Sequence, residues 1–415
     1  MLAGIRISIA QRLSSRRNSD DSWHGCDNSC IRSRLEAMTL TATDEKQKEM
    51  IDSEHVSRHD IETANVYVNP FSPGSETVAK GSNSPIVFIR GTGSIGMRHL
   101  HVFRDLLGVR AIAVPRRPDR VQSLQNEGYE AVSSLPKATR GKDSFLVVAT
   151  DTDRHLEDAL EGIKEGYKAI LIEKPITPSV AGISRLRTAS SSINDRVFVG
   201  CNLRFDAGLN VFREMLPRIG DIHHVRIEAQ SFLPDWRPTR NYKESYSADP
   251  QMGGVLRDLI HEIDYAVWLF GKPSSVTALL LNTGSLKIAA EESADVLWRT
   301  PSGASISIRL DYITRHYRRV MTAFGNRGDL TCDLATQIVK LQLAESELVT
   351  IKCPQDRNEA MREQADSFLC NAMNGSSCRL ATFEDGAFAI ALCDAARRSS
   401  ISGRTELIDD EWRIR

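Results

Sequence analysis

An aspartate and a histidine in the segment 253–271 have types and a spacing that could provide a general base. The apolar residues around them recur at helical spacing and Gly271 is a natural stop, so we predict one helix over 256–270. Asp258 and His261 would then share a face of that helix. A carboxylate one turn from an imidazole can orient the ring and raise its basicity, as deprotonation of a hydroxyl requires. A histidine on a helix can instead have a purely structural role.

A lysine at the tip of a predicted strand is the second candidate catalytic residue. The predicted strand 168–172 ends in Glu173, Lys174 and Pro175. Because proline disfavours helical geometry in the preceding residue, we expect Lys174 to be extended there. Its ammonium could then hydrogen-bond a substrate oxygen and stabilise the charge that develops on it. The alternative is an exposed lysine before a turn.

Three glycines with the spacing G-x-G-x-x-G lie between a predicted strand, 86–89, and a predicted helix, 97–107. This order of elements is the context in which the spacing indicates dinucleotide binding. The first glycine allows a tight turn, the second lets the backbone approach a pyrophosphate, and the third lets helix and strand pack closely. The free N–H groups at the helix start would face the phosphates. A tight turn without a ligand is the alternative. The candidate cofactor ligands here are Gly91, Gly93, Ser94, Ile95 and Gly96.

The end of the next predicted strand, 109–114, bears on which dinucleotide binds. An acidic residue at this tip would bind the 2′-hydroxyl of NAD, whereas arginines accommodate the 2′-phosphate of NADP. This strand runs into Arg116 and Arg117, with no acid at its tip. Two guanidiniums suit a phosphate dianion, so NADP is the favoured cofactor and NAD the other possibility. Both arginines could also be solvated loop charges.

Polar residues follow the third predicted strand, 144–149, at its carboxyl end. Thr150 and Asp153 are good turn and N-cap residues, so local structure alone could account for them. Residues in this position also line the crevice where such sheets bind ligands. We therefore count them as cofactor candidates, together with His155 at the start of a helix expected over 155–166.

A loop rich in proline, aromatic residues and arginine is the candidate substrate site. An apolar ring face can pack on a sugar while charged donors bind its hydroxyl groups. Trp236 could equally pack against the helix that follows. The candidates are Trp236, Arg237 and Tyr246.

Taken together, these motifs resemble the Gfo/Idh/MocA oxidoreductase family, over about 84–403 of the chain. The resemblance rests on Gly91-x-Gly93-x-x-Gly96-x-x-His99, Ala149-Thr150 with His155, Glu173-Lys174-Pro175, Asn202-x-Arg204-Phe205 and Gly253-Gly254 with Asp258 and His261. One departure is Arg90, where the family usually has an apolar residue or glycine. Another is the spacing of the aspartate and the histidine, which many members place one residue further apart.

The resemblance implies site roles for several of these residues. Lys174 would contact the reacting hydroxyl or carbonyl beside the nicotinamide, and Asp258 and His261 would work with it. Asp258 could be a direct substrate ligand or could only orient His261. Glu173 is assigned to the cofactor site, and Arg204 would lie near the substrate cleft unless it pairs with a surface acid.

The predicted fold is α/β. An extension that is disordered or wrongly started, 1–83, precedes a Rossmann dinucleotide-binding domain, 84–200. A substrate-binding α/β domain with an open, mainly antiparallel sheet, 201–415, follows. Its expected elements are strands over 294–299, 304–310 and 319–324 and closing helices over 363–372 and 384–399.

Composition narrows the function classes. The net charge of −1 gives no reason to expect nucleic acid, and no apolar run approaches the ~20 residues that span a bilayer, so we expect no membrane partner. The eight cysteines are read as thiols of a cytoplasmic protein, and a metal site at Cys26, Cys30 and His24 is not expected.

We therefore expect an NAD(P)-dependent oxidoreductase that transfers hydride between nicotinamide and a hydroxyl or keto carbon of a sugar, nucleotide-sugar or cyclitol. The family resemblance implies an open sheet that makes a homo-oligomer the expected state. The alternatives are a dinucleotide-binding regulator of a sugar pathway and an NAD-dependent glycosidase of the same fold. A regulator would be expected to lack the pair Lys174 and His261, which this chain has.

Overall fold

The computed structural model of the chain describes residues 66–67, 84–138, 143–374 and 379–408. The expected extension lies outside these ranges, as do Cys26, Cys30 and His24, except for the strand β1 (Val66–Tyr67). The extension was predicted to be disordered, but β1 within it pairs in parallel with β14 (Val349–Lys352). The described residues belong to one compact unit.

A six-stranded sheet forms the cofactor half, in the order β15-β6-β5-β4-β2-β3. Its five parallel strands are buried almost throughout, as expected for a sheet covered on both faces. The Rossmann prediction is confirmed. The parallel strands are β2 (Ile86–Arg90), β3 (Arg110–Val114), β4 (Ser144–Val148), β5 (Ala169–Ile172) and β6 (Val197–Val199).

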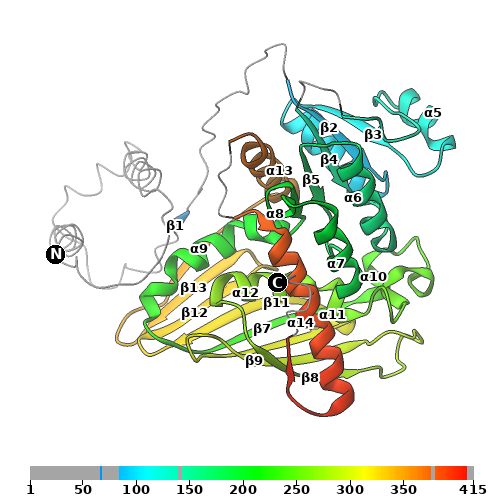
Figure 1. Ribbon diagram of the computed structural model, residues 1–415. Helices are drawn as coiled ribbons and strands as arrows, with labels where there is room; N and C mark the ends of the chain where they lie inside the picture. Colours follow the sequence, from blue (N-terminus) through cyan, green and yellow to red (C-terminus); the bar gives the residue numbers. More distant parts are fainter. Residues whose placement is uncertain (1–65, 68–83, 139–142, 375–378, 409–415) are drawn as a thin grey trace, which may run out of the picture. The chain divides into compact units, whose positions relative to one another are not determined.

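Helices cover both faces of this sheet (Figure 1). The predicted helix over 97–107 starts earlier, at Ser94, and its last turn, Val102–Leu106, is a π-helix. The helix predicted over 155–166 is confirmed as α6. The helices are α4 (Ser94–His101), α5 (Asp119–Asn126), α6 (His155–Lys164), α7 (Val180–Ala189) and α8 (Ile193–Arg196).

The C-terminal part of the chain also contributes to this half. The strand β15 (Ala381–Thr382) pairs antiparallel with β6 at the edge of the sheet. On α13 (Arg357–Asn374), Phe368 packs edge-on against Phe145 and Phe198, with ring centroids 5.9 and 6.0 Å apart. The domain boundary expected at residue 200 stays a prediction. Two elements that follow it in the chain, β15 and α13, contact the first sheet.

A ten-stranded sheet forms the second half, in the order β1-β14-β13-β12-β11-β7-β10-β9-β8-β16. It is mainly antiparallel, as predicted, although β7 and β10 pair in parallel. The sequence prediction missed β7, which lies near the middle of the sheet. The strands are β7 (Ile222–Phe232), β8 (Ser275–Leu281), β9 (Ser293–Arg299), β10 (Ser305–Asp311), β11 (Ile313–Gly325), β12 (Gly328–Asp333), β13 (Ile338–Leu343) and β16 (Glu406–Leu407).

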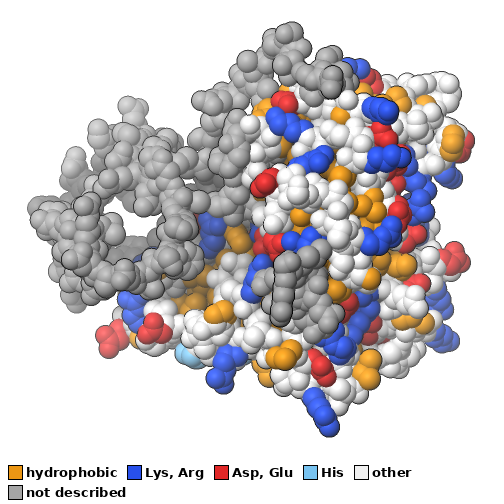
Figure 2. Space-filling model, viewed as in Figure 1, with side chains coloured by type: hydrophobic (Ala, Val, Ile, Leu, Met, Phe, Trp, Pro, Cys, Tyr) orange, Lys and Arg blue, Asp and Glu red, His pale blue; other side chains and the backbone are white. Residues whose placement is uncertain are grey.

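Helices of the second half pack on one face of this sheet (Figure 1). They are α9 (Ala207–Met215), α12 (Ile260–Phe270) and α14 (Phe383–Ser402), and the short α10 (Leu233–Trp236) follows β7. The face seen in Figure 2 carries interspersed positive and negative side chains, in keeping with the net charge of −1. None of the helices within the described ranges has the length and apolar character needed to cross a membrane.

The single helix predicted over 256–270 is wrong in one respect, because the structure divides it. The first piece is α11 (Val255–Asp258), and Leu259, with φ −95° and ψ 33°, separates it from α12. Leu256 and Ile263 are both buried. Two short helices therefore satisfy the apolar spacing as well as one long helix does. The predicted stop is confirmed, since Gly271 ends α12 with φ 90°.

Candidate active site

The glycine turn between β2 and α4 has the shape that a dinucleotide requires. A Cβ at Gly91, where φ is 96°, would lie 2.5 Å from the carbonyl oxygen of Ala149, and one at Gly96 would lie 2.0 Å from that of Gly91. Both glycines are therefore required by packing. A Cβ at Gly93 would have no atom within 4 Å, so the space in front of it is open. The start of α4, at Ser94 and Ile95, faces that space with free N–H groups, as a pyrophosphate site needs.

Two residues predicted to contact the cofactor, Glu173 and His155, hold loops at this edge of the sheet. The Nε2 atom of His99 lies 2.7 Å from a carboxylate oxygen of Glu173. Burial acts to raise the pKa of Glu173, but the hydrogen bond with His99 and the charges of His99, Lys174 and His155 together outweigh it and the pKa is lowered. Both ring nitrogens of His155 face backbone carbonyl oxygens, of Pro175 at 2.8 Å and of Thr150 at 3.1 Å. These contacts hold the two loops at the carboxyl ends of β4 and β5.

The remaining cofactor candidates lie along the same edge of the sheet. The hydroxyl of Thr150 donates to Asp158 at 2.8 Å, and Arg116 lies 3.5 Å from the same carboxylate. Arg117 and Asp153 are exposed. Asp153 lies in a 3-10 turn before α6 and does not cap that helix, so the N-cap role that was the structural alternative for it is wrong.

Lys174 contacts the backbone just before His261 next to this edge. The Nζ atom of Lys174 donates to the backbone carbonyl oxygen of Asp258 at 2.8 Å. Burial, and then the charges of Lys174 and Arg319, hold the pKa of His261 well below its ordinary value. The ring is therefore neutral near pH 7, in the form that can accept a proton, but its basicity is lowered, whereas the sequence predicted that Asp258 would raise it. Its Nδ1 is buried without a partner among the described residues.

Asp258 does not orient His261, as one of the two predicted roles required. Its Oδ2 accepts a hydrogen bond from the hydroxyl of Tyr312, and its Oδ1 is buried without a partner in the described part of the chain. The break at Leu259 removes the shared helical face on which the prediction depended. Sequence reasoning missed Tyr312, which follows β10, because no local spacing connects it to Asp258.

A cavity of about 720 Å³ opens between Lys174 and the loop after β7. Trp236, Arg237 and Tyr246 line it, so the structure brings the three predicted substrate residues together with the lysine. Trp236 also packs, since its ring lies edge-on to Tyr312 at 5.5 Å. Burial, and then the charge of Asp258, raise the pKa of Tyr246 well above its usual value. The lining residues that the prediction missed are Asp151, Leu233, Arg240, Asn241, Tyr242, Glu244, Ser245 and Ser247.

Arg204 is not available to a substrate, contrary to the prediction. It is 2% exposed, and its guanidinium makes two hydrogen bonds to Asp264, at 2.6 and 2.9 Å. A third, at 3.1 Å, goes to Asp385 at the start of α14. Because a buried charge requires partners, this triad is a structural one that joins α12 and α14 to the segment after β6.

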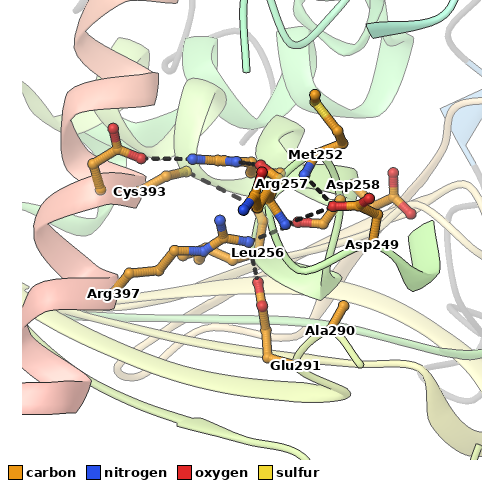
Figure 3. A network of polar contacts seen from close by, with 12 residues as sticks. Asp249, Met252, Leu256, Arg257, Asp258, Ala290, Glu291, Cys393 and Arg397 are labelled. Carbon is orange, nitrogen blue, oxygen red and sulfur yellow. Dashed lines mark hydrogen bonds and ion pairs between the residues drawn. The ribbon is translucent and has the colours of Figure 1, made fainter. Parts of the chain in front are cut away.

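A second polar network holds the glycine turn that precedes α11 (Figure 3). Arg397 of α14 donates to the carbonyl oxygen of Gly253 at 2.7 Å and to Glu291 at 2.8 Å. A Cβ at Gly254, where φ is 83°, would lie 2.2 Å from Glu291. Arg257 of α11 pairs with Asp394 of α14 at 2.8 Å. The network therefore fixes the position of α11, and with it the carbonyl group that receives Lys174.

Comparison with known proteins places both halves of the chain in one family. The profile described as "Oxidoreductase family, NAD-binding Rossmann fold" matches residues 86–201, and the "GFO/IDH/MocA C-terminal domain" matches 216–331. The chain belongs to the Gfo/Idh/MocA family. The resemblance read from the motifs is thus confirmed.

Relatives of this Gfo/Idh/MocA chain carry names of sugar and inositol enzymes. Myo-inositol 2-dehydrogenase of Thermotoga maritima is 24% identical over 340 residues, which cover 77% of this chain and 97% of the relative. Glucose-6-phosphate 3-dehydrogenase of Bacillus subtilis is 25% identical over 223 residues, 50% of this chain and 60% of the relative. An uncharacterized oxidoreductase of Escherichia coli, YhhX, is 30% identical over 134 residues, 32% of this chain and 36% of the relative.

Solved structures show the same fold. Levoglucosan dehydrogenase in complex with NADH and levoglucosan superposes with a TM-score of 0.69 at 17% identity, covering 79% of this chain and 100% of that structure. An inositol dehydrogenase homologue from Azotobacter vinelandii complexed with NAD+ gives 0.68 at 14% identity, covering 79% and 98%.

Proposed function

We propose that this chain is an NAD(P)-dependent dehydrogenase or reductase that acts on a CH–OH group of a sugar, a nucleotide-sugar or a cyclitol. The observation that carries the proposal is the position of Lys174, which follows β5, lines the cavity and lies close enough for its charge to act on the neutral ring of His261. Ligands bind at this edge in open α/β sheets.

In the oxidation direction, the residues of the chain remove the proton of the substrate hydroxyl and stabilise the negative charge that develops on its oxygen. His261 takes the proton of the substrate hydroxyl. Lys174 donates a hydrogen bond to the same oxygen and stabilises its negative charge. The chemistry that a bound nicotinamide supplies is acceptance of the hydride, with both electrons of the C–H bond. The substrate carbon and oxygen remain as the carbonyl product, and the proton of the hydroxyl group stays on His261.

Asp258 and Tyr312 form the wall beside these two groups. The carboxylate accepts from the tyrosine hydroxyl and leaves Oδ1 without a partner among the described residues. The carboxylate is 2% exposed, as Arg204 is, so we assign it to holding this wall in place. Direct contact of Asp258 with the substrate, the first of the two roles that the sequence left open, stays a prediction.

The lining of the cavity supports a polar ring as substrate. Trp236 and Tyr246 offer aromatic surface for a ring face, while Arg237 and Asn241 offer donors for hydroxyl or phosphate oxygens. The names of the relatives, which include enzymes for inositol and for glucose 6-phosphate, agree with this class.

We favour NADP over NAD as the cofactor. The side chains of Arg116 and Arg117 are exposed beyond the end of β3, where an acidic residue would bind the ribose of NAD. Family relatives of known structure have been captured with NAD+ or NADH, so the preference of this chain requires its own measurement.

We also propose a cytoplasmic homo-oligomer. Leu279, Leu281 and Leu297 are 52%, 42% and 49% exposed on strands of the large sheet, with Asp295 and Arg309 nearby, and exposed leucines with a polar surround suit a subunit contact. The buried thiols Cys201, Cys332, Cys353 and Cys393 suit a reducing compartment.

A fluorescence titration of the full-length protein with NADPH and with NADH tests the cofactor, and a screen of polyols and sugar phosphates for reduction of NADP+ and NAD+ tests the reaction. We expect tighter binding of NADPH and turnover with at least one ring polyol. Absence of binding by both cofactors would contradict the proposal at its first step.

A further inference from the structure

A buried arginine lies at the cofactor edge of the first sheet and takes no part in the mechanism above. Arg90 is the last residue of β2, directly before Gly91, and it is 9% exposed. Its Nε lies 3.2 Å from Oδ1 of Asp158, and its Nη2 lies 3.4 Å from Glu161. A charge in such a position is tolerated only with partners, so Arg90 and the two acids of α6 form one unit.

Asp158 is the centre of this unit and has more than one cation beside it. Its carboxylate is 2% exposed, and Thr150 donates to Oδ2 at 2.8 Å. Two guanidiniums approach Oδ1, Arg90 from within the sheet at 3.2 Å and Arg116 from the surface at 3.5 Å. Arg90 therefore holds the closer position, and Arg116 makes a long contact at the limit of a hydrogen bond.

The balance of charge around Asp158 decides whether the guanidinium of Arg116 pairs with that carboxylate or stays available to a ligand. Arg90 and Arg116 carry two positive charges, and Asp158 and Glu161 carry two negative charges. If Arg90 were absent, the nearest cation for the buried carboxylate of Asp158 would be Arg116, which would be drawn in and neutralised. With Arg90 in place, Arg116 has Asp158 as its one polar partner among the described residues, so most of its N–H groups there are unused at the tip of β3. A guanidinium in this state can bind a phosphate dianion through two parallel hydrogen bonds.

We propose that Arg90 is a specificity-determining residue for the cofactor. It satisfies Asp158 and so leaves Arg116 free to bind a phosphate monoester on the adenosine ribose. The proposal rests on the proposed preference for NADP. Arg90 acts through Arg116 and is a positioning residue, so its effect falls on the binding of NADPH and not on that of NADH.

Fluorescence titration of full-length variants with NADPH and NADH at one ionic strength tests this role. In Arg90→Met, which keeps the length of the side chain, we expect the Kd for NADPH to rise about tenfold, the effect of one lost charge-assisted contact. The Kd for NADH should stay within about twofold. Arg110→Met is the matched control, because Arg110 pairs with Glu130 on the surface at the start of β3. It should change neither constant.

The decisive variant is Arg90→Met combined with Asp158→Asn. It removes the carboxylate that would otherwise capture Arg116, and it leaves no unpaired buried charge at position 158 if the single variant fails to fold. We expect this double variant to regain the preference for NADPH. A preference that stays lost, or equal losses for both cofactors in Arg90→Met, would overturn the role of Arg90.

Arg116→Ala separates this proposal from the one on which it rests. If this variant binds NADPH as well as the unaltered protein does, the assignment of Arg116 to the 2′-phosphate is itself wrong. If Arg116→Ala loses NADPH and Arg90→Met does not, only the role of Arg90 fails. Both roles are supported if each variant loses NADPH selectively and the double variant Arg90→Met, Arg116→Ala is no worse than Arg116→Ala.

Discussion

The ammonium nitrogen of Lys174 lies 2.8 Å from the backbone carbonyl oxygen of Asp258. This hydrogen bond joins the segment after β5 in the Rossmann half to the end of α11 in the second half. Because the acceptor belongs to the backbone, the position of the lysine does not depend on the carboxylate of Asp258, which accepts from Tyr312. Substitutions of the two side chains should therefore have separable effects.

Replacing Lys174 by Met should lower kcat by about a hundredfold or more, since the variant loses the donor to the reacting oxygen. The Kd of the cofactor should not change. Steady-state kinetics and fluorescence titration measure the two effects. Lys168→Met is the matched control, because Lys168 forms an exposed ion pair with Asp143 before β5. Turnover near that of the unaltered protein would remove Lys174 from the mechanism.

The pH dependence of kcat/KM for alcohol oxidation should reflect His261. Burial and then the positive charge of Lys174 lower the pKa of this histidine, so the ring stays neutral when the pH falls through 6.5, the ordinary value. The base form is lost only at lower pH, so kcat/KM should be level through 6.5 and decline below it. His261→Gln should lose that decline and most of the rate. An acidic limb centred at or above 6.5 would contradict the assignment.

Tyr312→Phe should weaken the fold and leave cofactor binding intact. It removes the donor to a buried carboxylate of Asp258 and so should lower the free energy of unfolding by roughly 1–3 kcal/mol. Urea unfolding followed by fluorescence measures this change. Tyr317→Phe is the control, since Tyr317 is 60% exposed and should cost almost nothing. Equal stabilities for the two variants would show that the contact with Asp258 is energetically unimportant.

Substitutions at two glycines of the dinucleotide turn should have different effects, one on cofactor binding and the other on the stability of the fold. Gly93→Ala places a methyl group in open space, so the protein should fold normally and bind both cofactors at least tenfold more weakly. Gly96→Ala places the methyl group 2.0 Å from a backbone oxygen and should destabilise the fold itself. Thermal unfolding and cofactor titration distinguish the two. Normal cofactor affinity in Gly93→Ala would mean that the pyrophosphate does not approach this turn.

The apolar face of the large sheet should control the oligomeric state. Leu279→Glu introduces a charge among Leu281 and Leu297, so it should shift the protein toward the monomer. Light scattering after size exclusion reports the mass. Ile401→Glu is the control, because Ile401 is 88% exposed near the end of α14. A monomeric unaltered protein would exclude the proposed contact.

Short-range patterns in the sequence determined the Rossmann half and the two catalytic candidates. The turn at Gly91 to Gly96 lies between a buried strand and a helix, and Lys174 follows the next-to-last parallel strand. Apolar runs and glycine spacing report on neighbours within a few residues, so these predictions did not require knowledge of the packing. His261 was found in the same way, from helical spacing.

Only the tertiary structure decided which polar side chains hold one another. Arg204 donates hydrogen bonds to Asp264 and Asp385, which lie 60 and 181 residues further along the chain. Local residue spacing could not show that these acids, and not a substrate, bind its guanidinium. Tyr312 reaches Asp258 across 54 residues, and Arg90 reaches Asp158 across 68. A buried charge or hydroxyl must find a partner wherever the fold places one. Because those partners are distant in the sequence, no local pattern indicates them. Only the fold shows which polar residues are used to hold the site in place and which remain available to bind ligands.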